Sequence, residues 1–568
     1  MKKILLFLVI CISANAQNNA DSFDWSFNGG GGFNTTKRMQ YNSQGDLLFL
    51  MDVGHQTTFE GTTITEPGSG SFPGTATFIG KRAQNGASTL LIKKNTPNPT
   101  YATFQDFVID NNDNIIVTGA TFGYVATVFY DFGNGIKLYG KGNFIAKYNP
   151  QGVCQWANLI NYNLTSNSYS ENKNIGLGVL PNNDIYFANR STGYNASYQN
   201  PFWLIRFNAA GAEIWHKEWL MPNSSSVAIL TSKNNCFFDN TGKAYFYIYS
   251  IQGDIVTIDG TVLTPPAGGH PSTSSLLTIN SDGTNGVFST YRGAFGDIAV
   301  EKTTGNVLLD WRQYFQNPSP FDTLPLAPNN TYQFVGIVAV DSNRNFINRT
   351  AALFNTSYGS LFPLGNLNFV TNTVMSPTET VSTQTQTFTA TKYTPTWKFF
   401  ENFTFTKFVA HPEINGTSTN SYDLMAQYNN KLAVSGSYSL VNNATILVNG
   451  TTLTTCNNDP NFATLYPTWA TLQGDVFISQ LTISGGLDVS QNKLSNFKIY
   501  PNPSNGVFNI EIDENLINAK ATIYNLLGQK IKDFSIKSTT TTAMLNKGMY
   551  LLKIEKDGSK TTKKLIVN

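Results

Sequence analysis

The sequence predicts an all-β protein made of a long repetitive body and a small C-terminal β-sandwich. Two turn-containing patterns recur at similar intervals along the body, and such recurrence marks a repeated structural unit. The last 72 residues contain segments in which apolar and polar side chains alternate, as in a half-buried strand. Aromatic residues make up 13% of the chain, which argues against disorder because disordered chains lack aromatics.

The first sixteen residues have the pattern of a secretory signal peptide. Lys2-Lys3 precede an apolar run from Ile4 to Ile12, and Ala14-Asn15-Ala16 places small residues where a signal peptidase cuts. Nine apolar residues are too few to cross a bilayer, which needs about 20. A buried strand, a membrane anchor and a lipoprotein modified at Cys11 are the disfavoured alternatives. No later segment reaches transmembrane length, so we expect a mature chain from Gln17 without a transmembrane anchor.

Composition argues against nucleic-acid binding, a metal centre and a disulfide framework. Charged residues are 13% of the chain against a usual value of about 25%, and no basic aromatic patch occurs. The remaining cysteines are odd in number and far apart, so one bridge and buried free thiols are both open. The histidines are equally scattered, and the sequence assigns no catalytic, cofactor-binding or metal-binding residue and no cofactor. The cysteines considered are Cys154, Cys236 and Cys456, and the histidines are His55, His216, His270 and His411.

The first recurring pattern is a hairpin turn that ends in glycine and is followed three residues later by isoleucine or leucine. Asn-Gly and Asp-Gly at its centre favour a type I′ turn, because both residues need positive φ. The four glycines are 74, 125 and 190 residues apart. Taken as one, two and three units, these spacings give a period of roughly 65 residues. The copies are 59–64, 134–138, 258–263 and 448–453.

The second recurring pattern is an apolar strand, a turn with glycine and then a tryptophan. Residues 144–156 and 203–215 match at their asparagine, glycine and tryptophan positions, and 275–283 is a degenerate third copy. The tryptophans are 131, 59 and 182 residues apart, which again corresponds to about two, one and three units. They are Trp25, Trp156, Trp215 and Trp397, and degenerate copies are expected near Phe288 and Phe346.

The order of these markers favours a closed ring of seven units between Trp25 and the Gly485-Gly486 boundary. The strand 23–27 precedes the first hairpin, whereas the last unit, 431–484, has no tryptophan strand of its own. We therefore expect the N-terminal strand to complete the last unit, which removes an exposed sheet edge. The unit resembles bacterial seven-bladed β-propeller repeats. A blade usually has about 40–50 residues, so long loops such as Ser376–Thr391 must hold the surplus; two or three β-sandwiches in series are the alternative.

Two turns in the body have some of the residues of known loop motifs. Asp110–Asn114 supplies the first, third and fifth oxygens of a calcium loop but lacks its glycine and closing glutamate. We interpret it as a turn before the strand Ile115–Thr118. Asn280–Thr284 is similar to the Asp-box of sialidase propellers, which is itself a structural turn, but no tryptophan follows at the expected place.

Aromatic and acidic residues offer weaker candidates. Trp156 and Trp215 could stack on a sugar ring or a quinone cofactor, but their fixed position in the repeat favours packing between blades. Gly29–Gly32 precedes no helix that could bind phosphate, so we interpret it as a loop. The sequence pairs no two carboxylates for acid–base chemistry. The carboxylates considered are Asp106, Asp110, Asp113, Glu213 and Glu218.

A separate module is predicted at residues 497–568, after a body at 17–485 and a linker at 486–496. Its opening segment, 497–504, has two prolines that suit an edge strand or an entry turn. Asp557-Gly558 predicts a hairpin before the last strand. A small antiparallel, immunoglobulin-like β-sandwich is expected, with strands at 507–513, 521–528, 548–554 and 561–567.

Four motifs of this module occur in a fixed order: Tyr500–Gly506 (YPNPSNG), Ile523–Gln529 (IYNLLGQ), Lys547–Ile554 (KGMYLLKI) and the lysine-containing end Thr561–Asn568 (TTKKLIVN). In this order they resemble type A sorting domains of type IX secretion cargo, over 72 of the 568 residues. The resemblance implies recognition by the type IX machinery and passage across the outer membrane. It also implies later removal of the domain, as the body is released or joined to surface lipopolysaccharide. An ordinary ligand-binding domain is the alternative.

The charge of the chain supports this division. Residues 497–568 have eleven lysines against six acidic residues, a net charge of +5, whereas the whole chain has +2. A basic module on an acidic body fits a separately recognised address, so we expect a secreted or cell-surface protein. The body is expected to be a non-enzymatic module that binds a glycan or a protein. A propeller-type glycoside hydrolase or quinoprotein dehydrogenase is the alternative.

Overall fold

The computed structural model divides the chain into two compact units, Met1–Ile483 and Ser484–Asn568. The predicted signal peptide and linker lie outside the residues that it describes. The described residues are 23–29, 35–54, 56–59, 62–65, 75–93, 101–122, 129–140, 142–160, 173–190, 200–221, 227–230, 237–250, 256–258, 261–263, 273–292, 294–314, 332–350, 360–383, 387–391, 394–410, 424–439, 445–448, 451–454, 474–483, 498–512, 517–525, 529–556 and 559–568.

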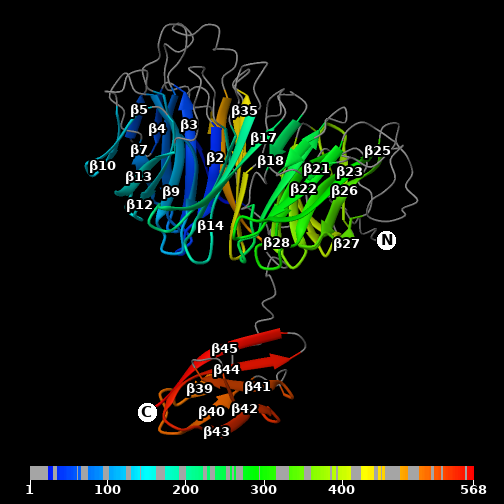
Figure 1. Cartoon of the computed structure of the whole chain (residues 1–568). Coiled ribbons are helices and arrows are strands. Elements are labelled where there is room, and N and C mark those ends of the chain that lie inside the picture. Colours follow the sequence, from blue (N-terminus) through cyan, green and yellow to red (C-terminus); the bar gives the residue numbers. More distant parts are fainter. Residues whose placement is uncertain are drawn as a thin grey trace, which may run out of the picture. The chain divides into compact units, whose positions relative to one another are not determined.

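The described residues of the first unit form seven four-stranded antiparallel sheets, numbered 1 to 7 here in chain order (Figure 1). No helix occurs in the described ranges, so the all-β class is confirmed. Sheet 1 contains β2 (Thr35–Tyr41), β3 (Leu47–Gly54), β6 (Thr75–Arg82) and β7 (Ser88–Lys93); sheet 2 contains β8 (Tyr101–Ile109), β9 (Ile115–Phe122), β12 (Gly142–Tyr148) and β13 (Cys154–Ile160); sheet 3 contains β14 (Lys173–Val179), β15 (Ile185–Arg190), β16 (Asn200–Phe207) and β17 (Glu213–Met221).

The later sheets repeat the same antiparallel order. Sheet 4 contains β18 (Val227–Leu230), β19 (Ala244–Ser250), β22 (Thr273–Ile279) and β23 (Asn285–Arg292); sheet 5 contains β24 (Ala294–Val300), β25 (Val307–Tyr314), β26 (Tyr332–Val340) and β27 (Phe346–Arg349); sheet 6 contains β28 (Leu361–Gly365), β29 (Asn368–Met375), β32 (Thr394–Glu401) and β33 (Thr404–Ala410); sheet 7 contains β34 (Leu424–Tyr428), β35 (Lys431–Ser439), β38 (Gly474–Thr482) and β1 (Phe23–Gly29).

Two-stranded ribbons are inserted between the second and third strands of five sheets. Four of them are the predicted glycine hairpins, and at Asn134-Gly135 both residues have positive φ, 54° and 76°, as a type I′ turn requires. The fifth lies within Ser376–Thr391, so the stretch that the sequence assigns to a long loop connects two strands of sheet 6 and contains a ribbon. The ribbons are β4–β5 (Gln56–Phe59, Thr62–Thr65), β10–β11 (Phe129–Gly133, Ile136–Tyr139), β20–β21 (Val256–Ile258, Thr261–Leu263), β30–β31 (Thr380–Ser382, Thr387–Thr389) and β36–β37 (Thr445–Val448, Thr451–Thr454).

The first strand of the chain belongs to the last sheet. β1 pairs antiparallel with β38, with Trp25 opposite Gln480 and Phe27 opposite Ile478, and β38 pairs in turn with β35. This is the pairing that the order of the sequence markers predicts. It joins residues that are about 450 positions apart in the chain.

The tryptophans used as markers do not all occupy the same position. Trp25, Trp156 and Trp215 lie on the fourth strands β1, β13 and β17, but Trp397 lies on the third strand β32 and is fully buried. Counting Trp397 as an equivalent marker was therefore wrong. The expected degenerate copies do lie on fourth strands, Phe288 on β23 and Phe346 on β27.

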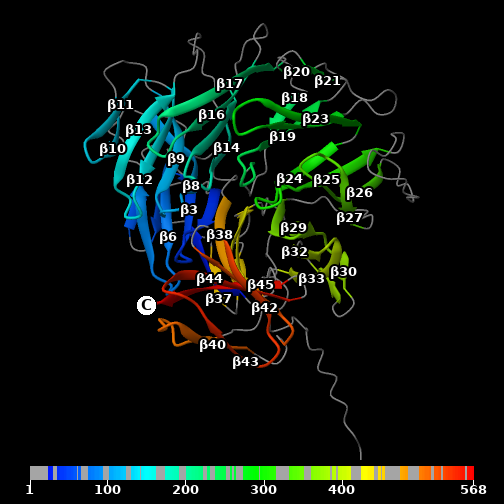
Figure 2. The same ribbon diagram turned by 60° about the horizontal axis from the view of Figure 1, so that its bottom comes forward.

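Hydrophobic clusters hold consecutive sheets together. Six clusters of the described residues each take side chains from two neighbouring sheets, and they join sheet 7 to sheet 1 and each of sheets 1 to 5 to the next. In the first of them, Met39 and Phe49 of sheet 1 pack with Ile478 of sheet 7. Figure 2 shows sheets 1 to 6 following one another in an arc, coloured from blue through cyan and green to yellow-green.

Glycines in the turns between third and fourth strands allow close contact at two of these seams. Gly211 has a φ of +83°, and a Cβ atom there would lie 2.8 Å from the ring of Trp156 in the preceding sheet. Gly283, with a φ of +85°, lies in the same way against Trp215, where a Cβ would be 3.2 Å from the ring. Both tryptophans are therefore packed between sheets, as their fixed position in the repeat suggests.

The second unit is a sandwich of two antiparallel sheets. One contains β39 (Lys498–Tyr500), β40 (Val507–Glu511) and β43 (Thr540–Met544), and the other β42 (Lys530–Ser535), β41 (Lys520–Asn525), β44 (Gly548–Lys556) and β45 (Ser559–Val567). Phe508 and Ile510 from the first sheet pack against Ile523, Leu552 and Leu565 from the second. The four predicted strands correspond to β40, β41, β44 and β45. β42 was not predicted, because most of its side chains are exposed and show no alternation.

Gly211→Ala is expected to lower the free energy of unfolding of the body by about 3 kcal/mol, because the new methyl group would meet Trp156. A left-handed backbone also disfavours alanine, by roughly 1–2 kcal/mol. Gly86→Ala is the matched control, since it has a φ of +88° and its nearest neighbour is the flexible end of Arg82 at 3.9 Å. Denaturant unfolding of both variants checks this, and equal losses would contradict the seam contact.

Candidate functional site

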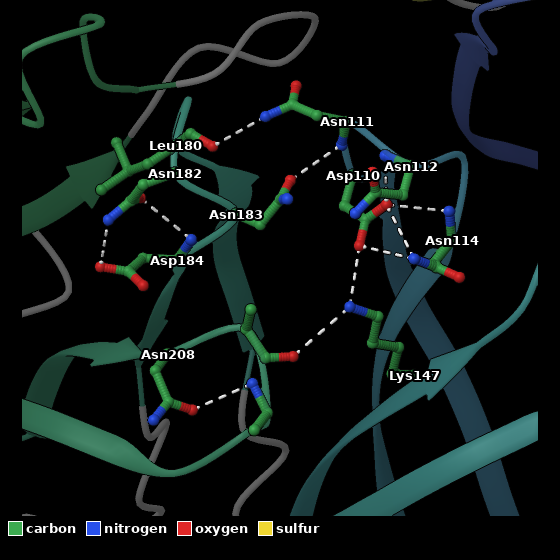
Figure 3. Close-up of polar contacts among 12 residues, drawn as sticks. Asp110, Asn111, Asn112, Asn114, Lys147, Leu180, Asn182, Asn183, Asp184 and Asn208 are labelled. Carbon is green, nitrogen blue, oxygen red and sulfur yellow. Dashed lines mark hydrogen bonds and ion pairs between the residues drawn. The ribbon is translucent and has the colours of Figure 1, made fainter.

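Six tight turns in sheets 1 to 5 share one hydrogen-bond arrangement. In each, the first residue is asparagine or aspartate, and its side-chain oxygen accepts the backbone N–H groups two and four positions later. Asn208 Oδ1, for example, accepts the backbone N–H groups of Ala210 and Ala212 at 3.0 Å each, and Figure 3 shows one of these two bonds. The fourth residue of each turn has positive φ. The first residues are Asn42, Asp110, Asn149, Asn208, Asp239 and Asp341.

The loop that is similar to a calcium site is one of these turns, as interpreted from the sequence. Asp110 Oδ1 accepts from the backbone N–H groups of Asn112 and Asn114, at 2.9 Å each, and Oδ2 lies 2.8 Å from Lys147 Nζ (Figure 3). Burial raises the pKa of Asp110, but the bonds from Lys147 and Asn114 outweigh it, so the pKa is lowered. Both oxygens of the Asp110 carboxylate thus bind groups of the protein, as in a structural turn.

The segment that is similar to an Asp-box is also a turn. Asp282 Oδ1 accepts from the backbone N–H of Thr284 at 2.9 Å and from its hydroxyl at 2.7 Å. These two bonds lower the pKa of Asp282. Asn280 Nδ2 donates to the same threonine hydroxyl at 3.0 Å. The polar groups therefore stabilise the connection from β22 to β23.

A cation on the third strand links the turns of two sheets. Lys147 Nζ, bonded to Asp110 of its own sheet, also donates to Ala209 O in the next sheet at 3.4 Å. Arg206 repeats the arrangement, because its Nη2 lies 2.6 Å from Asp184 Oδ2 and its Nη1 donates to Ser281 O at 2.6 Å. These charges serve the packing of sheets 2, 3 and 4.

Turns between first and second strands also bond directly to one another. Asp113, at the end of sheet 2, accepts from both the backbone N–H and the hydroxyl of Ser43 in sheet 1, at 2.8 and 2.5 Å. Asn111 N–H donates to Asn183 Oδ1 in sheet 3 at 3.0 Å (Figure 3). This end of the sheets is consequently held by contacts within the body.

The remaining candidate carboxylates are not brought together. Asp106 on β8 is buried, accepts the Phe107 N–H at 2.8 Å and lies 3.8 Å from Arg38 Nε. Glu213 on β17 contacts His216 Nδ1 at 2.6 Å on the surface. Glu218 is on β17 as well, so the structure does not bring these candidates together as a pair for acid–base chemistry. Of the glycine run, Gly29 ends β1 and the rest lies outside the described residues.

The cysteine and histidine positions give no metal site in the part of the chain that the structure describes. Cys154 is a buried free thiol, and burial raises its pKa to about 12. The remaining candidates, Cys236, Cys456, His55, His270 and His411, lie outside the described residues.

One buried carboxylate was missed by the sequence analysis. Asp310 on β25 is fully buried, and neither of its oxygens has a hydrogen-bond partner. Arg312 Nη2 lies 3.6 Å from Asp310 Oδ2, close enough for an ion pair but too far for a hydrogen bond. Burial raises the pKa of Asp310 to about 6, although Arg312 opposes the shift. A single aspartate in an apolar strand gave no sequence signal for this environment.

In the second unit, the Pro-Asn-Pro motif holds the last strand. Asn502 Oδ1 accepts the Ile566 N–H at 2.8 Å, and Asn502 Nδ2 donates to Lys564 O at 2.8 Å. Ser504 N–H donates to Ile566 O at 2.9 Å, and its carbonyl accepts the Asn568 N–H at 2.8 Å. The motif thus bonds β45 as a neighbouring strand would, up to the end of the chain.

The arrangement of this unit agrees with the comparison against protein families. Residues 498–568 match the family described as "Secretion system C-terminal sorting domain". The chain is type IX secretion cargo. The sorting domain directs export to the cell surface or the medium and implies recognition by the type IX machinery. No curated protein matches the chain in sequence.

Several solved structures are similar to the chain at very low identity. A protein of unknown function from Dyadobacter fermentans is 10% identical, with 82% of this chain and 100% of that chain covered and a TM-score of 0.36. PorZ of Porphyromonas gingivalis is 8% identical, over 94% and 81%, with a TM-score of 0.17. The N11 neuraminidase-like protein of A/flat-faced bat/Peru/033/2010 is 8% identical, over 82% and 95%, with a TM-score of 0.30. Propeller-like proteins are among these neighbours, but such scores carry no argument about function.

The described residues contain no helix that is long and apolar enough to span a bilayer.

Asp310→Asn is expected to stabilise the body at pH 8. Since the folded-state pKa of about 6 exceeds the usual 3.8, the folded chain binds this proton more tightly than the unfolded chain does. The parent therefore loses stability as the pH rises from about 4 to about 6, by about 3 kcal/mol in total. The variant cannot ionise and should lack this loss in denaturant unfolding between pH 4 and pH 8.

Asp110→Asn is the matched control for this prediction. The pKa of Asp110 is lowered, so its charged form stabilises the folded chain above the usual pKa, and this variant should lose stability at pH 8. A parent-like fall of stability with pH in Asp310→Asn would contradict the role given to Asp310.

Proposed function

We propose that the body, residues 17–485, is a closed seven-bladed β-propeller that binds a glycan outside the cell. Support for the ring comes from the pairing of β1 with β38 and from the six hydrophobic clusters between consecutive sheets. We further propose that residues 1–16 are a signal peptide and 486–496 a linker before the sorting domain.

The observation that carries this proposal is the difference between the two ends of the sheets. At one end, turns such as 42–46 and 110–114 bond to each other and to themselves. At the other end, the connections between second and third strands vary from 9 residues between β15 and β16 to 34 between β35 and β38. Loops that vary in length on a rigid scaffold are where proteins usually place binding residues. The ligand is accordingly assigned to this variable end.

A glycan is favoured over a protein by the composition of the longest connection. Residues 455–473 contain Asn457, Asn458, Tyr466 and Trp469. Aromatic faces stack on the apolar face of a sugar ring, and amide side chains bond its hydroxyl groups. The low content of charged residues, 13% of the chain, also suits a neutral ligand.

Binding of the purified full chain to an array of bacterial and host polysaccharides tests this proposal. Trp469→Ala is expected to weaken the binding about tenfold or more, as loss of a stacking aromatic does at other interfaces. Val153→Ser is the control, because Val153 is exposed in a tight turn at the opposite end. Absence of binding to every glycan would overturn the proposal, and release of sugar products would show an enzyme instead.

The sorting role of residues 498–568 makes a second, independent prediction. A chain that lacks residues 497–568 should accumulate in the periplasm of a host with type IX secretion, whereas the full chain reaches the surface or the medium. Fractionation followed by immunoblotting measures the distribution. The body serves as its own control, since its glycan binding should survive the deletion. Unchanged export would contradict the sorting role.

A further inference from the structure

Exposed apolar side chains are concentrated in the sorting domain. Of the eleven large apolar residues that are well exposed in the described part of the chain, six lie between residues 500 and 551. The domain supplies only a small part of the described residues, so exposed apolar side chains are enriched there. Contiguous apolar surface on a soluble domain marks a site of contact with another molecule. The six residues are Tyr500, Val507, Ile531, Met544, Met549 and Leu551.

One group of these side chains lies on the outer face of the four-stranded sheet. Leu552 and Ile554 of β44 point into the core, so the alternate residues Met549 and Leu551 point outward and are 45% and 37% exposed. Leu551 lies opposite Tyr524 on β41 and opposite Lys564 on β45. Figure 1 shows β41, β44 and β45 as adjacent strands of this sheet.

The same face continues across the last strand. Met549 lies opposite Ile566 on β45, next to Leu565, which points into the core. Lys530 lies opposite Tyr524 at the other side of the sheet. The outer face therefore has an apolar centre with a lysine on each side. We call this set the β44 face: Tyr524, Lys530, Met549, Leu551, Lys564 and Ile566.

The Pro-Asn-Pro motif determines the position of one side of this face. The two β45 residues that Asn502 bonds through their backbone are Lys564 and Ile566, which are the two that β45 contributes to the β44 face. The side chain of Asn502 thus fixes the backbone of β45 at the two residues whose side chains point outward. The Pro-Asn-Pro motif at the start of the domain therefore positions the lysine-containing strand at its end.

The opposite sheet does not offer an equivalent surface. Val507 and Met544 lie opposite each other there and are exposed, but the neighbouring polar residues bond among themselves. Thr542 donates to Asn509 at 2.8 Å, and Lys498 pairs with Glu511 at 3.1 Å. Lys498 is thereby paired with a carboxylate, as Lys530 is with Asp533 at 3.5 Å on the other sheet, so the charge assigned to the β44 face is that of Lys564.

We propose that the β44 face is the surface by which the type IX machinery binds this cargo, and that the receptor presents an apolar groove bordered by carboxylates. The net charge of +5 of residues 497–568 matches such a partner. Leu551 is the central apolar contact, Lys564 supplies the adjacent charge, and Asn502 is a positioning residue. The inference rests on the sorting role of the domain and does not depend on the ligand of the body.

Secretion of the full chain with the double substitution Leu551→Ser and Lys564→Glu tests the proposal. The ratio of protein in the medium to protein in the periplasm is expected to fall about tenfold or more, because a central contact and its charge are both lost. Met544→Ser with Lys498→Glu is the matched control on the opposite sheet, and its ratio should equal that of the parent. Thermal unfolding of the purified chains establishes that each variant is folded.

Two further variants separate recognition from folding. Lys564→Arg keeps the positive charge, so its ratio of protein in the medium to protein in the periplasm should equal that of the parent. Asn502→Ala should lower this ratio and increase hydrogen exchange at the backbone N–H of Ile566. The proposal is overturned if the Leu551/Lys564 variant is secreted like the parent, or if the opposite-sheet control is blocked to the same extent. The deletion of residues 497–568 separates failure of this proposal from failure of the sorting role. If the domain had no sorting role, the chain without residues 497–568 would still be exported.

Discussion

The body depends on one local interaction, the hydrogen bonds by which an asparagine or aspartate fixes the turn that it opens. This side chain satisfies two backbone N–H groups that would otherwise be unpaired. The turn then has a fixed shape, and a residue with positive φ follows at its fourth position. Because that residue is often glycine, the turn can approach the neighbouring sheet closely, as Gly211 approaches Trp156 in the preceding sheet. Local turn chemistry therefore sets the distance between neighbouring sheets.

The same hydrogen bonds constrain one end of the sheets. Lys147 and Arg206 each bond the turn of one sheet to the carbonyl group of another, so an insertion at that end would break contacts in two sheets. At the other end of the sheets, five connections between second and third strands contain a two-stranded ribbon. The length of the chain between strands therefore varies at one end of the sheets, while the turns at the other end keep the same hydrogen-bond arrangement.

The sequence was most informative where a feature depends on residues close together in the chain. The Asn134-Gly135 hairpin and the module after residue 497 are of this kind. It was misleading at Trp397, because a tryptophan buried within a third strand and one packed at a seam give the same spacing. It was silent about Asp310, since the direction of one side chain between two sheets depends on strands far apart in the chain. The residues that share the outer face of the sorting domain could be identified only from the pairing register of β44 and β45, which the sequence motifs do not specify.

The pairing of β1 with β38 also has a consequence for how the chain can be made. Sheet 7 needs residue 25 and residue 480 at once, so nearly the whole body must be synthesised before its first strand has a partner. Contacts this distant in sequence form slowly, and until then the edge of β38 is open to other strands. Truncation from either end of the body damages the same sheet. The two termini of the body therefore form a single unit of assembly, although the chain reaches one of them first and the other last.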